Sequence, residues 1–252
     1  MSETTVILPK SPVAASTTNP KNLIIFSKPK VGKTSNLAQL KDSLILDFEE
    51  GSDFVEAYKI KVNSIKELKE IGETIKNESY PYKYIVIDTI TELEKMCIPY
   101  AETLYSKTAP GKNWFNPGGG KELYGNILYM PNGAGYGPYR DAFMKVLDYV
   151  NTLADRIILL GHVKDSYLEK NGTQVDSLDL DLTGKLKRMT AAKSDAIGYL
   201  YRKGDTNILS FKTKDTVSCG ARSSHLSNAE IVLSEKDENG NLITHWDRVF
   251  ID

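Results

Sequence analysis

The chain has 252 residues, 40% of them hydrophobic, and its 32 Lys and Arg against 33 Asp and Glu leave a formal net charge of -1. A chain of this length and composition buries a core without staples, which excludes a disordered protein, and its charge gives no global attraction to nucleic acid. Two distant cysteines, Cys97 and Cys219, argue against a secreted disulfide scaffold and favour a reduced, cytoplasmic setting. No apolar run approaches the roughly 20 residues of a membrane helix, so no membrane partner is expected.

Short apolar runs alternate with segments of helical spacing after a Ser-, Thr- and Pro-rich start. Residues 1–20 predict a flexible N-terminal arm, and residues 21–252 a single domain. Strands apolar on both faces and separated by helices indicate an α/β fold with a mainly parallel central sheet, whose ligands bind beyond the carboxyl ends of the strands. The expected strands are 23–26, 44–48, 84–87 and 156–160, and the expected helices include 65–75 and 143–153.

Three further segments complete the predicted organisation. Residues 106–137 mix Gly, Pro, Asn and Tyr and predict a long surface loop. Residues 163–183 predict a second irregular or hairpin segment. The turn at 239–241, followed by the apolar residues of 246–251, predicts a last strand and a C-terminal antiparallel hairpin that closes the sheet.

A phosphate-binding loop follows the first expected strand. Backbone N–H groups of such a loop, and of the helix that it opens, point at phosphate oxygens. Lys33 is expected to reach the β- and γ-phosphates of ATP and the Thr34 hydroxyl to ligate Mg²⁺, although Ser27 stands where the pattern usually has its first Gly. A chance Gly-Lys-Thr is the alternative. The expected cofactor-binding residues are Ser27, Lys28, Pro29, Lys30, Val31, Gly32, Lys33, Thr34 and Ser35.

Acidic residues end two other expected strands. Asp88 follows 84–87 and is expected to hold Mg²⁺ together with Thr34, or alternatively to cap the next helix. Glu49 follows 44–48, where a carboxylate can act as the general base for an attacking water. The alternative for Glu49 is a solvated acidic turn.

These motifs, in this order over residues 22–222, resemble the RecA-core ATPases, and in particular the small phage-encoded RecA-like proteins associated with single-strand annealing and recombination. The resemblance implies a three-layer RecA-like P-loop NTPase core. It also implies that Glu49, and not Glu50, activates water. His162 occupies the place of a polar sensor, often Gln in the family, that couples the γ-phosphate to a DNA-binding loop.

The resemblance also assigns a role to a pair of lysines. In RecA-like filaments a Lys-x-Lys pair reaches across the subunit interface to the neighbour's γ-phosphate, which here implies Lys212 and Lys214 and head-to-tail self-association as a filament or ring. Such a cation supplied in trans spreads transition-state charge. Lysines that protect a sheet edge from aggregation are the alternative, and Arg222 is a candidate for an additional finger.

Single-stranded DNA is the partner that the resemblance implies, with residues 106–137 and 163–190 as DNA-facing loops. Backbone-tracking sites combine cations with aromatic platforms. Residues 185–222 carry nine Lys and Arg against three Asp, a charge of +6, whereas residues 226–252 carry -4. The cations and aromatics in and just after the first segment are Lys107, Lys112, Trp114, Phe115, Lys121, Tyr124, Tyr129, Tyr136 and Tyr139.

The sequence therefore predicts an Mg²⁺-dependent ATPase that acts on single-stranded DNA in phage recombination or replication, in the cytoplasm of an infected bacterial host. A single-strand annealing or single-strand-binding protein is a further expected partner. One alternative is a P-loop small-molecule kinase, which needs an Arg-rich lid in a chain that has six Arg. The other is a non-catalytic module whose DNA or partner binding is switched by ATP.

Overall fold

The computed structural model describes residues 8–79, 82–118, 125–170, 173–214 and 217–251. Over these residues the main sheet runs in the order β3-β2-β4-β5-β1-β7-β8-β10-β11, with the strands from β3 to β7 parallel and those from β7 to β11 antiparallel. The strands are β1 Asn22–Ser27, β2 Ser43–Asp47, β3 Lys59–Lys61, β4 Tyr84–Asp88, β5 Arg156–Lys170, β7 Ala196–Lys203, β8 Thr206–Ser210, β10 Glu230–Lys236 and β11 Leu242–Thr244. Two more strands pair beside this path, β6 Thr173–Leu180 with β5 and β9 Gly220–Ala221 with β7.

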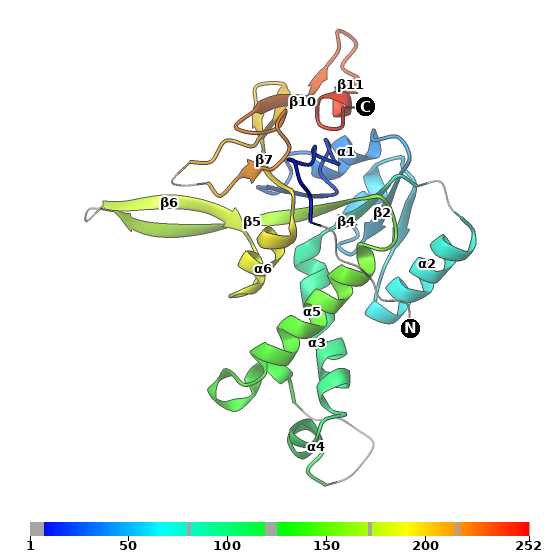
Figure 1. Cartoon of the computed structure of the whole chain (residues 1–252), viewed down its shortest axis with the longest axis vertical. Coiled ribbons are helices and arrows are strands. Elements are labelled where there is room, and N and C mark those ends of the chain that lie inside the picture. Colours follow the sequence, from blue (N-terminus) through cyan, green and yellow to red (C-terminus); the bar gives the residue numbers. More distant parts are fainter. Residues whose placement is uncertain (1–7, 80–81, 119–124, 171–172, 215–216, 252) are drawn as a thin grey trace.

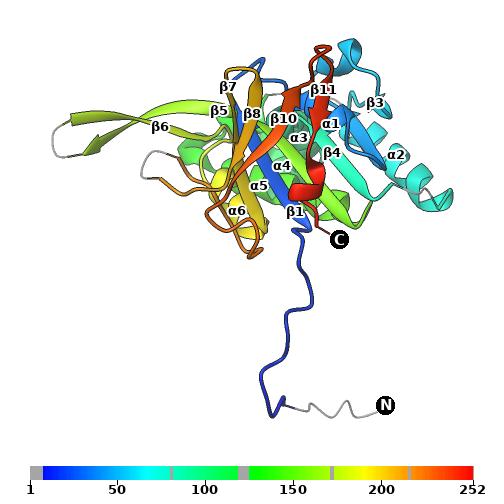
Figure 2. The same cartoon turned by 90° about the horizontal axis from the view of Figure 1, so that it is seen from above.

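Helices cover both faces of the sheet and make three layers (Figures 1 and 2). One apolar cluster joins the sheet to α2 (Ile65–Asn77), α3 (Ile90–Tyr105), α5 (Tyr136–Val150) and α6 (Leu186–Lys193). A second cluster, on the other face, joins it to α1 (Lys33–Ala38) and to the C-terminal residues around Trp246. The expected α/β architecture with a mainly parallel sheet is confirmed.

The sequence pattern explains the parallel strands and their helices. Every residue of β2 and β4 is buried, as expected for strands that are covered on both faces. Ser64 begins α2 by accepting a hydrogen bond from the N–H of Glu67, and the buried residues Ile65, Leu68 and Ile75 recur at helical spacing on one face. The strands expected at 23–26, 44–48, 84–87 and 156–160 and the two predicted helices are all present.

The segment 106–137 is not one long loop. It contains α4 (Ala109–Phe115), two short 3₁₀ helices (Ile127–Tyr129 and Pro131–Gly133) and the start of α5. Its Gly and Pro residues end and begin short helices, which a compositional reading cannot distinguish from a loop. In Figure 1, α4 lies at the far end of α3 and α5, away from the sheet.

The first predicted DNA-facing set is divided by burial. Phe115 and Tyr139 are buried in the core, whereas Tyr129 and Tyr136 are exposed. The hydroxyl of Tyr139 donates to Glu94 on α3, so this ring joins two helices instead of forming a surface platform. Lys121 and Tyr124 lie outside the described residues.

The strand expected to end at residue 160 continues to Lys170 and folds back through β6 as a hairpin that projects from the body of the molecule (Figure 1). The hairpin alternative for 163–183 is therefore confirmed, and the remainder of the expected loop 163–190 includes the first residues of α6. At the base of the hairpin the Leu180 side chain packs over Gly161, where a Cβ atom would stand 2.2 Å from Leu180 Cδ1.

The C-terminal hairpin is present, but its second strand is β11 and not the apolar residues of 246–251. Residues Trp246–Arg248 form a 3₁₀ helix, and the indole N–H of Trp246 donates to the carbonyl oxygen of Asn36 at 2.9 Å. The ring also stacks on Phe250. Trp246, Val249 and Phe250 pack into the second core cluster without forming a strand. Their apolar character reflects this burial, so it does not by itself indicate a strand.

Residues 8–18 run away from the sheet in Figure 2. Residues 8–18 are exposed, while Asn19 is buried and bonds to the backbone of Ile251 near the C-terminus. None of the helices in the described segments has the length and apolarity needed to cross a lipid bilayer.

Candidate functional site

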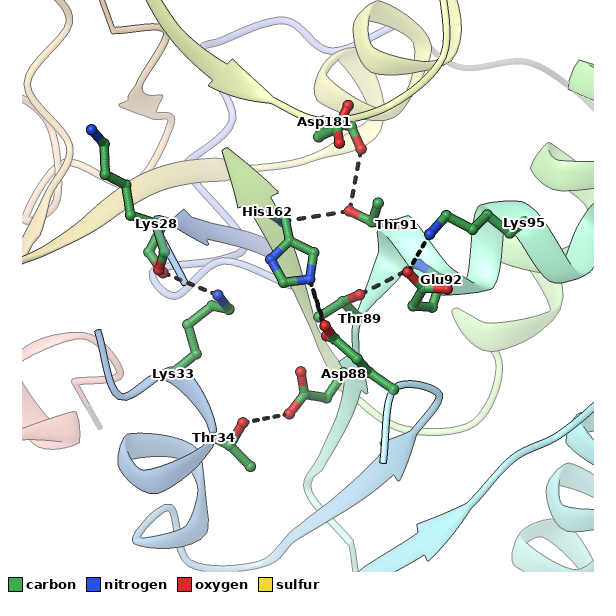
Figure 3. A network of polar contacts seen from close by, with 12 residues as sticks. Lys28, Lys33, Thr34, Asp88, Thr89, Thr91, Glu92, Lys95, His162 and Asp181 are labelled. Carbon is green, nitrogen blue, oxygen red and sulfur yellow. Dashed lines mark hydrogen bonds and ion pairs between the residues drawn. The ribbon is translucent and has the colours of Figure 1, made fainter. Parts of the chain in front are cut away.

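Sheet register places the predicted polar residues at one edge. In the parallel ladders Ser27 of β1 lies opposite His162 of β5, and Asp47 of β2 lies opposite Asp88 of β4. Because the carboxyl ends of parallel strands meet at the same edge, side chains that are far apart in the sequence gather there. Figure 3 shows this edge from close by.

The phosphate loop leaves β1 at Ser27 and turns into α1 through two residues of positive φ, Lys30 at 62° and Gly32 at 104°. Ser27 is buried and still part of β1, so this position needs no glycine conformation. The Lys33 ammonium donates to the Ser27 hydroxyl at 3.1 Å, and that hydroxyl donates to the Lys28 carbonyl at 2.8 Å. Of the nine predicted binding residues, Lys28, Pro29 and Lys30 are exposed, whereas Ser27 and Lys33 are buried.

Burial sets the electrostatics of Lys33, which is 8% exposed. Desolvation lowers the pKa of its ammonium, while the carboxylates of Asp88 and Glu49 act in the opposite direction. Among the described residues no carboxylate lies at ion-pair distance from the Lys33 ammonium, and a buried cation of this kind suits a site whose anionic partner is a ligand.

Thr34 and Asp88 meet as the sequence predicts. The Thr34 hydroxyl donates to Asp88 Oδ2 at 2.7 Å (Figure 3). Burial raises the pKa of Asp88, which is 3% exposed, and the nearby Asp47 and Glu49 add to that rise, although the hydrogen bond from Thr34 opposes it. The helix cap of α3 is Thr89 and not Asp88, so capping does not occupy this carboxylate.

Asp47 organises the turn that carries Glu49, and the sequence analysis missed it. Its carboxylate accepts hydrogen bonds from the N–H groups of Glu49 and Ser52, at 3.0 and 3.1 Å, and from the Ser52 hydroxyl. Burial opposes ionisation of Asp47, but these hydrogen bonds outweigh it and lower the pKa. An Asp at the end of an expected strand, directly before a turn, is the local signal for it, because Asp side chains at turns accept hydrogen bonds from the backbone two residues on.

Glu49 and His162, the predicted base and the predicted sensor, are in direct contact. His162 Nε2 lies 3.0 Å from each Glu49 carboxylate oxygen. Both side chains are partly exposed, His162 at 22% and Glu49 at 38%, so water reaches the pair. The structure therefore joins the turn after β2 to the middle of β5.

The base of the β5–β6 hairpin is fastened to α3 beside this pair. The Thr91 hydroxyl donates to the Asp181 carbonyl at 3.2 Å and lies 3.4 Å from the backbone nitrogen of His162 (Figure 3). Three residues later on α3, buried Glu94 accepts from the N–H of Thr183 at 3.1 Å. These bonds tie the base of the hairpin and the backbone of His162 to the same helix.

The two lysines predicted to act in trans follow β8, which pairs with β7 in the antiparallel part of the sheet. The Lys212 ammonium donates to Glu230 at 2.7 Å, Lys214 is exposed, and Arg222 pairs with Asp195 at 3.3 Å. Four of the nine cations counted in the basic stretch have acidic partners within the described residues, so its charge is partly neutralised. These four are Lys187, Lys193, Lys212 and Arg222.

The donor set fits ATP with Mg²⁺. Within the described segments no group of three or more His, Cys, Asp or Glu residues is arranged to hold a metal ion, which argues against an all-protein cage. Mg²⁺ is usually held by one or two carboxylates together with substrate phosphates. The Asp88 carboxylate and the Thr34 hydroxyl, whose oxygens lie 2.7 Å apart beside the Lys33 ammonium, are the residues that would hold such an ion.

A protein-family profile described as an AAA domain matches residues 19–223. No curated protein matches the chain. Among solved structures, a KaiC-like protein from the hyperthermophilic archaeon Pyrococcus horikoshii OT3 is similar at 11% identity and a TM-score of 0.46, over 89% of each chain. The RadB recombinase is similar at 11% identity and a TM-score of 0.43, over 88% of this chain and 90% of that one.

Proposed function

The chain belongs to the AAA domain family, with a P-loop ATPase-type domain, and on that premise we propose that it is a RecA-like, Mg²⁺-dependent ATPase that acts on single-stranded DNA in phage recombination or replication. The observation that carries the proposal is the convergence of Lys33, the Thr34–Asp88 pair and the Glu49–His162 pair at one sheet edge. Phosphoryl transfer to water needs this set of a cation, a metal-binding oxygen pair and a carboxylate base.

Each residue has a defined task in hydrolysis. Lys33 and the loop N–H groups bind the phosphates, and Thr34 and Asp88 orient the metal. Mg²⁺, when bound, polarises the phosphate oxygens as a Lewis acid. A Glu49 carboxylate oxygen takes the proton of the attacking water, and His162 holds that carboxylate in position.

The projecting β5–β6 hairpin supports the DNA part of the proposal. It continues the strand that carries His162, and its base is bonded to α3. DNA bound at the hairpin would act on the Glu49–His162 contact through this continuous strand. Exposed Lys185 and Arg188 follow the hairpin and supply cations for a phosphate backbone.

Head-to-tail assembly is part of the same proposal. Lys214 is exposed. Lys212 forms an ion pair with Glu230 in which both side chains are partly exposed, and the phosphates of a nucleotide on a neighbouring copy can replace Glu230 as its partner. Assembly would place these lysines at the phosphate site of the adjacent copy, as a filament or a ring. A single-strand annealing or single-strand-binding protein is a further proposed partner.

Steady-state ATP turnover, with and without single-stranded DNA over a salt series, tests the proposal. We expect Mg²⁺-dependent hydrolysis that Lys33→Ala abolishes, and a DNA stimulation that weakens as salt rises, because phosphate contacts release counterions. Absence of hydrolysis would overturn the enzyme assignment. Hydrolysis that is indifferent to DNA at every salt concentration would overturn the DNA assignment alone.

A further inference from the structure

Arg202 approaches the phosphate loop from a strand that contributes no sequence motif to the site. β7 runs parallel to β1, and Phe26 of β1 lies opposite Tyr199 of β7. β1 ends at Ser27, whereas β7 continues to Lys203. On the side of β7 that faces β1, its last residues therefore lie alongside the loop, while on the other side they pair with β8.

The guanidinium of Arg202 contacts this loop directly. Its Nη2 donates to the carbonyl oxygen of Val31 at 3.2 Å. It also lies 3.8 Å from the position that a Cβ atom on Gly32 would occupy. The Val31 carbonyl belongs to the Val31–Gly32 peptide, which immediately precedes Lys33, so Arg202 bonds to a peptide of the phosphate loop itself.

A chain of hydrogen bonds through β8 and β10 positions the Arg202 side chain. Arg202 lies opposite Asn207 in the antiparallel β7–β8 ladder, with Nε 3.5 Å from Asn207 Oδ1. Asn207 is 5% exposed, and its Nδ2 donates to Ser234 Oγ on β10 at 3.1 Å. Because the amide nitrogen is engaged with Ser234, the amide oxygen is left for the guanidinium.

The charge of Arg202 is also available to a ligand. Lys212 and Arg222 each pair with an acid, at 2.7 and 3.3 Å. Within the described part of the chain, no carboxylate lies within ion-pair distance of the Arg202 guanidinium. A planar cation with several donors and no acidic partner is suited to phosphate recognition.

We propose that Arg202 is a positioning residue of the nucleotide site, which holds the Val31–Gly32 peptide and adds positive charge beside the nucleotide's phosphate chain. It acts on nucleotide binding and not on the chemical step. The inference rests on the proposed ATP binding, and it adds a residue from β7, supported by β8 and β10, to a site otherwise built from β1, β2, β4 and β5.

Titration of each variant with ATP and Mg²⁺, together with steady-state turnover, tests this role. We expect Arg202→Ala to weaken ATP binding about ten-fold and to raise KM, with kcat changed less than about two-fold. The reason is that the lost contact stabilises the bound nucleotide equally in the ground state and in the transition state. Arg202→Lys keeps the charge but loses the fork, so its affinity should fall between those of the wild type and Arg202→Ala.

Lys203→Ala is the matched control, because it removes the same charge from the next residue of β7, which is exposed and whose side chain points to the other face. Its ATP affinity should equal that of the wild type. Thermal unfolding verifies that each variant is folded, and Arg202→Gln replaces Arg202→Ala if the latter is not.

Two failures are distinguishable. If the wild-type protein does not bind ATP, or Lys33→Ala binds it equally well, the proposed function fails. If the wild type binds ATP and Lys33→Ala does not, but folded Arg202→Ala or Arg202→Gln binds like the wild type, the role of Arg202 is overturned. The same holds if kcat falls while affinity is unchanged, or if Arg202→Lys equals the wild type.

Discussion

His162 Nε2 lies 3.0 Å from both carboxylate oxygens of Glu49, although 113 positions separate the two residues in the chain. The contact joins the turn after β2 to a strand that continues into the β5–β6 hairpin. The residue proposed to take a proton from water is therefore held by the residue proposed as the sensor.

Replacing Glu49 by Gln removes the proposed base but keeps the shape and polarity of the side chain. We expect Glu49→Gln to lower kcat at least about 100-fold, since general-base catalysis contributes on that scale, and to bind ATP like the wild type. Glu50→Gln is the matched control, because Glu50 is an exposed neighbouring acid. Unchanged turnover in Glu49→Gln, with binding lost in Lys33→Ala, would show that Glu49 is not the base.

Replacing His162 by Ala releases Glu49 from its partner. We expect the ratio of turnover with single-stranded DNA to turnover without it to fall to about one, because β5 then no longer contacts Glu49, the proposed general base. His245→Ala is the control, since His245 makes a similar contact with Glu235 at 3.1 Å on the C-terminal hairpin. A DNA stimulation of wild-type size in His162→Ala would contradict this coupling.

Asp88 and Asp47 should affect stability in opposite directions. The pKa of buried Asp88 is raised, so the stability it contributes is fully present below its unfolded pKa and lost as pH rises through the folded pKa. At neutral pH, Asp88→Asn should therefore increase the free energy of unfolding of the nucleotide-free protein by on the order of 1 kcal/mol. The gain should vanish as pH falls below about 4, while Mg²⁺-dependent ATP binding is lost.

Asp47→Asn serves as the comparison. Hydrogen bonds lower the pKa of Asp47, so its contribution is present above its unfolded pKa and lost as pH falls through the folded pKa. This variant should be less stable than the wild type at neutral pH. Denaturant unfolding from about pH 2 to about pH 8 measures both, and a loss of stability in Asp88→Asn at neutral pH would refute the burial argument.

Mixing two inactive proteins tests the trans lysines. Lys33→Ala keeps the lysine pair, and the double variant Lys212→Ala/Lys214→Ala keeps the phosphate loop. In an equimolar mixture about a quarter of head-to-tail interfaces combine both intact parts, so turnover should reappear where neither protein alone has it. Lys193→Ala is the control, because it loses a lysine that pairs with Asp148 away from the loop.

Two results would contradict the trans arrangement. One is a mixture no more active than its components. The other is a protein that stays monomeric by light scattering with ATP and single-stranded DNA present. Retained activity in the double variant on its own would show that these lysines protect the sheet edge and have no part in the chemistry.

The predictable part of the fold consisted of elements with strong local signals. The strands β1, β2 and β4 are short apolar runs with polar residues at their ends, and α2 has a cap and a regular apolar face. The segment around α4 was misjudged because Gly and Pro begin and end short helices as well as loops. The burial of Phe115 and Tyr139 depends on α3 and α5 packing together, which no local pattern encodes.

The sequence by itself determined the chemistry at the end of each strand, because the phosphate loop, Glu49 and Asp88 each lie within a few residues of an apolar run. Only the tertiary structure decided how these groups meet. Strand order and register bring His162 to Glu49, Asp88 to Thr34 and Arg202 to Val31, and they give Lys212 an acidic partner. Contacts between distant residues depend on which strands are neighbours, and that choice is made by packing the whole core.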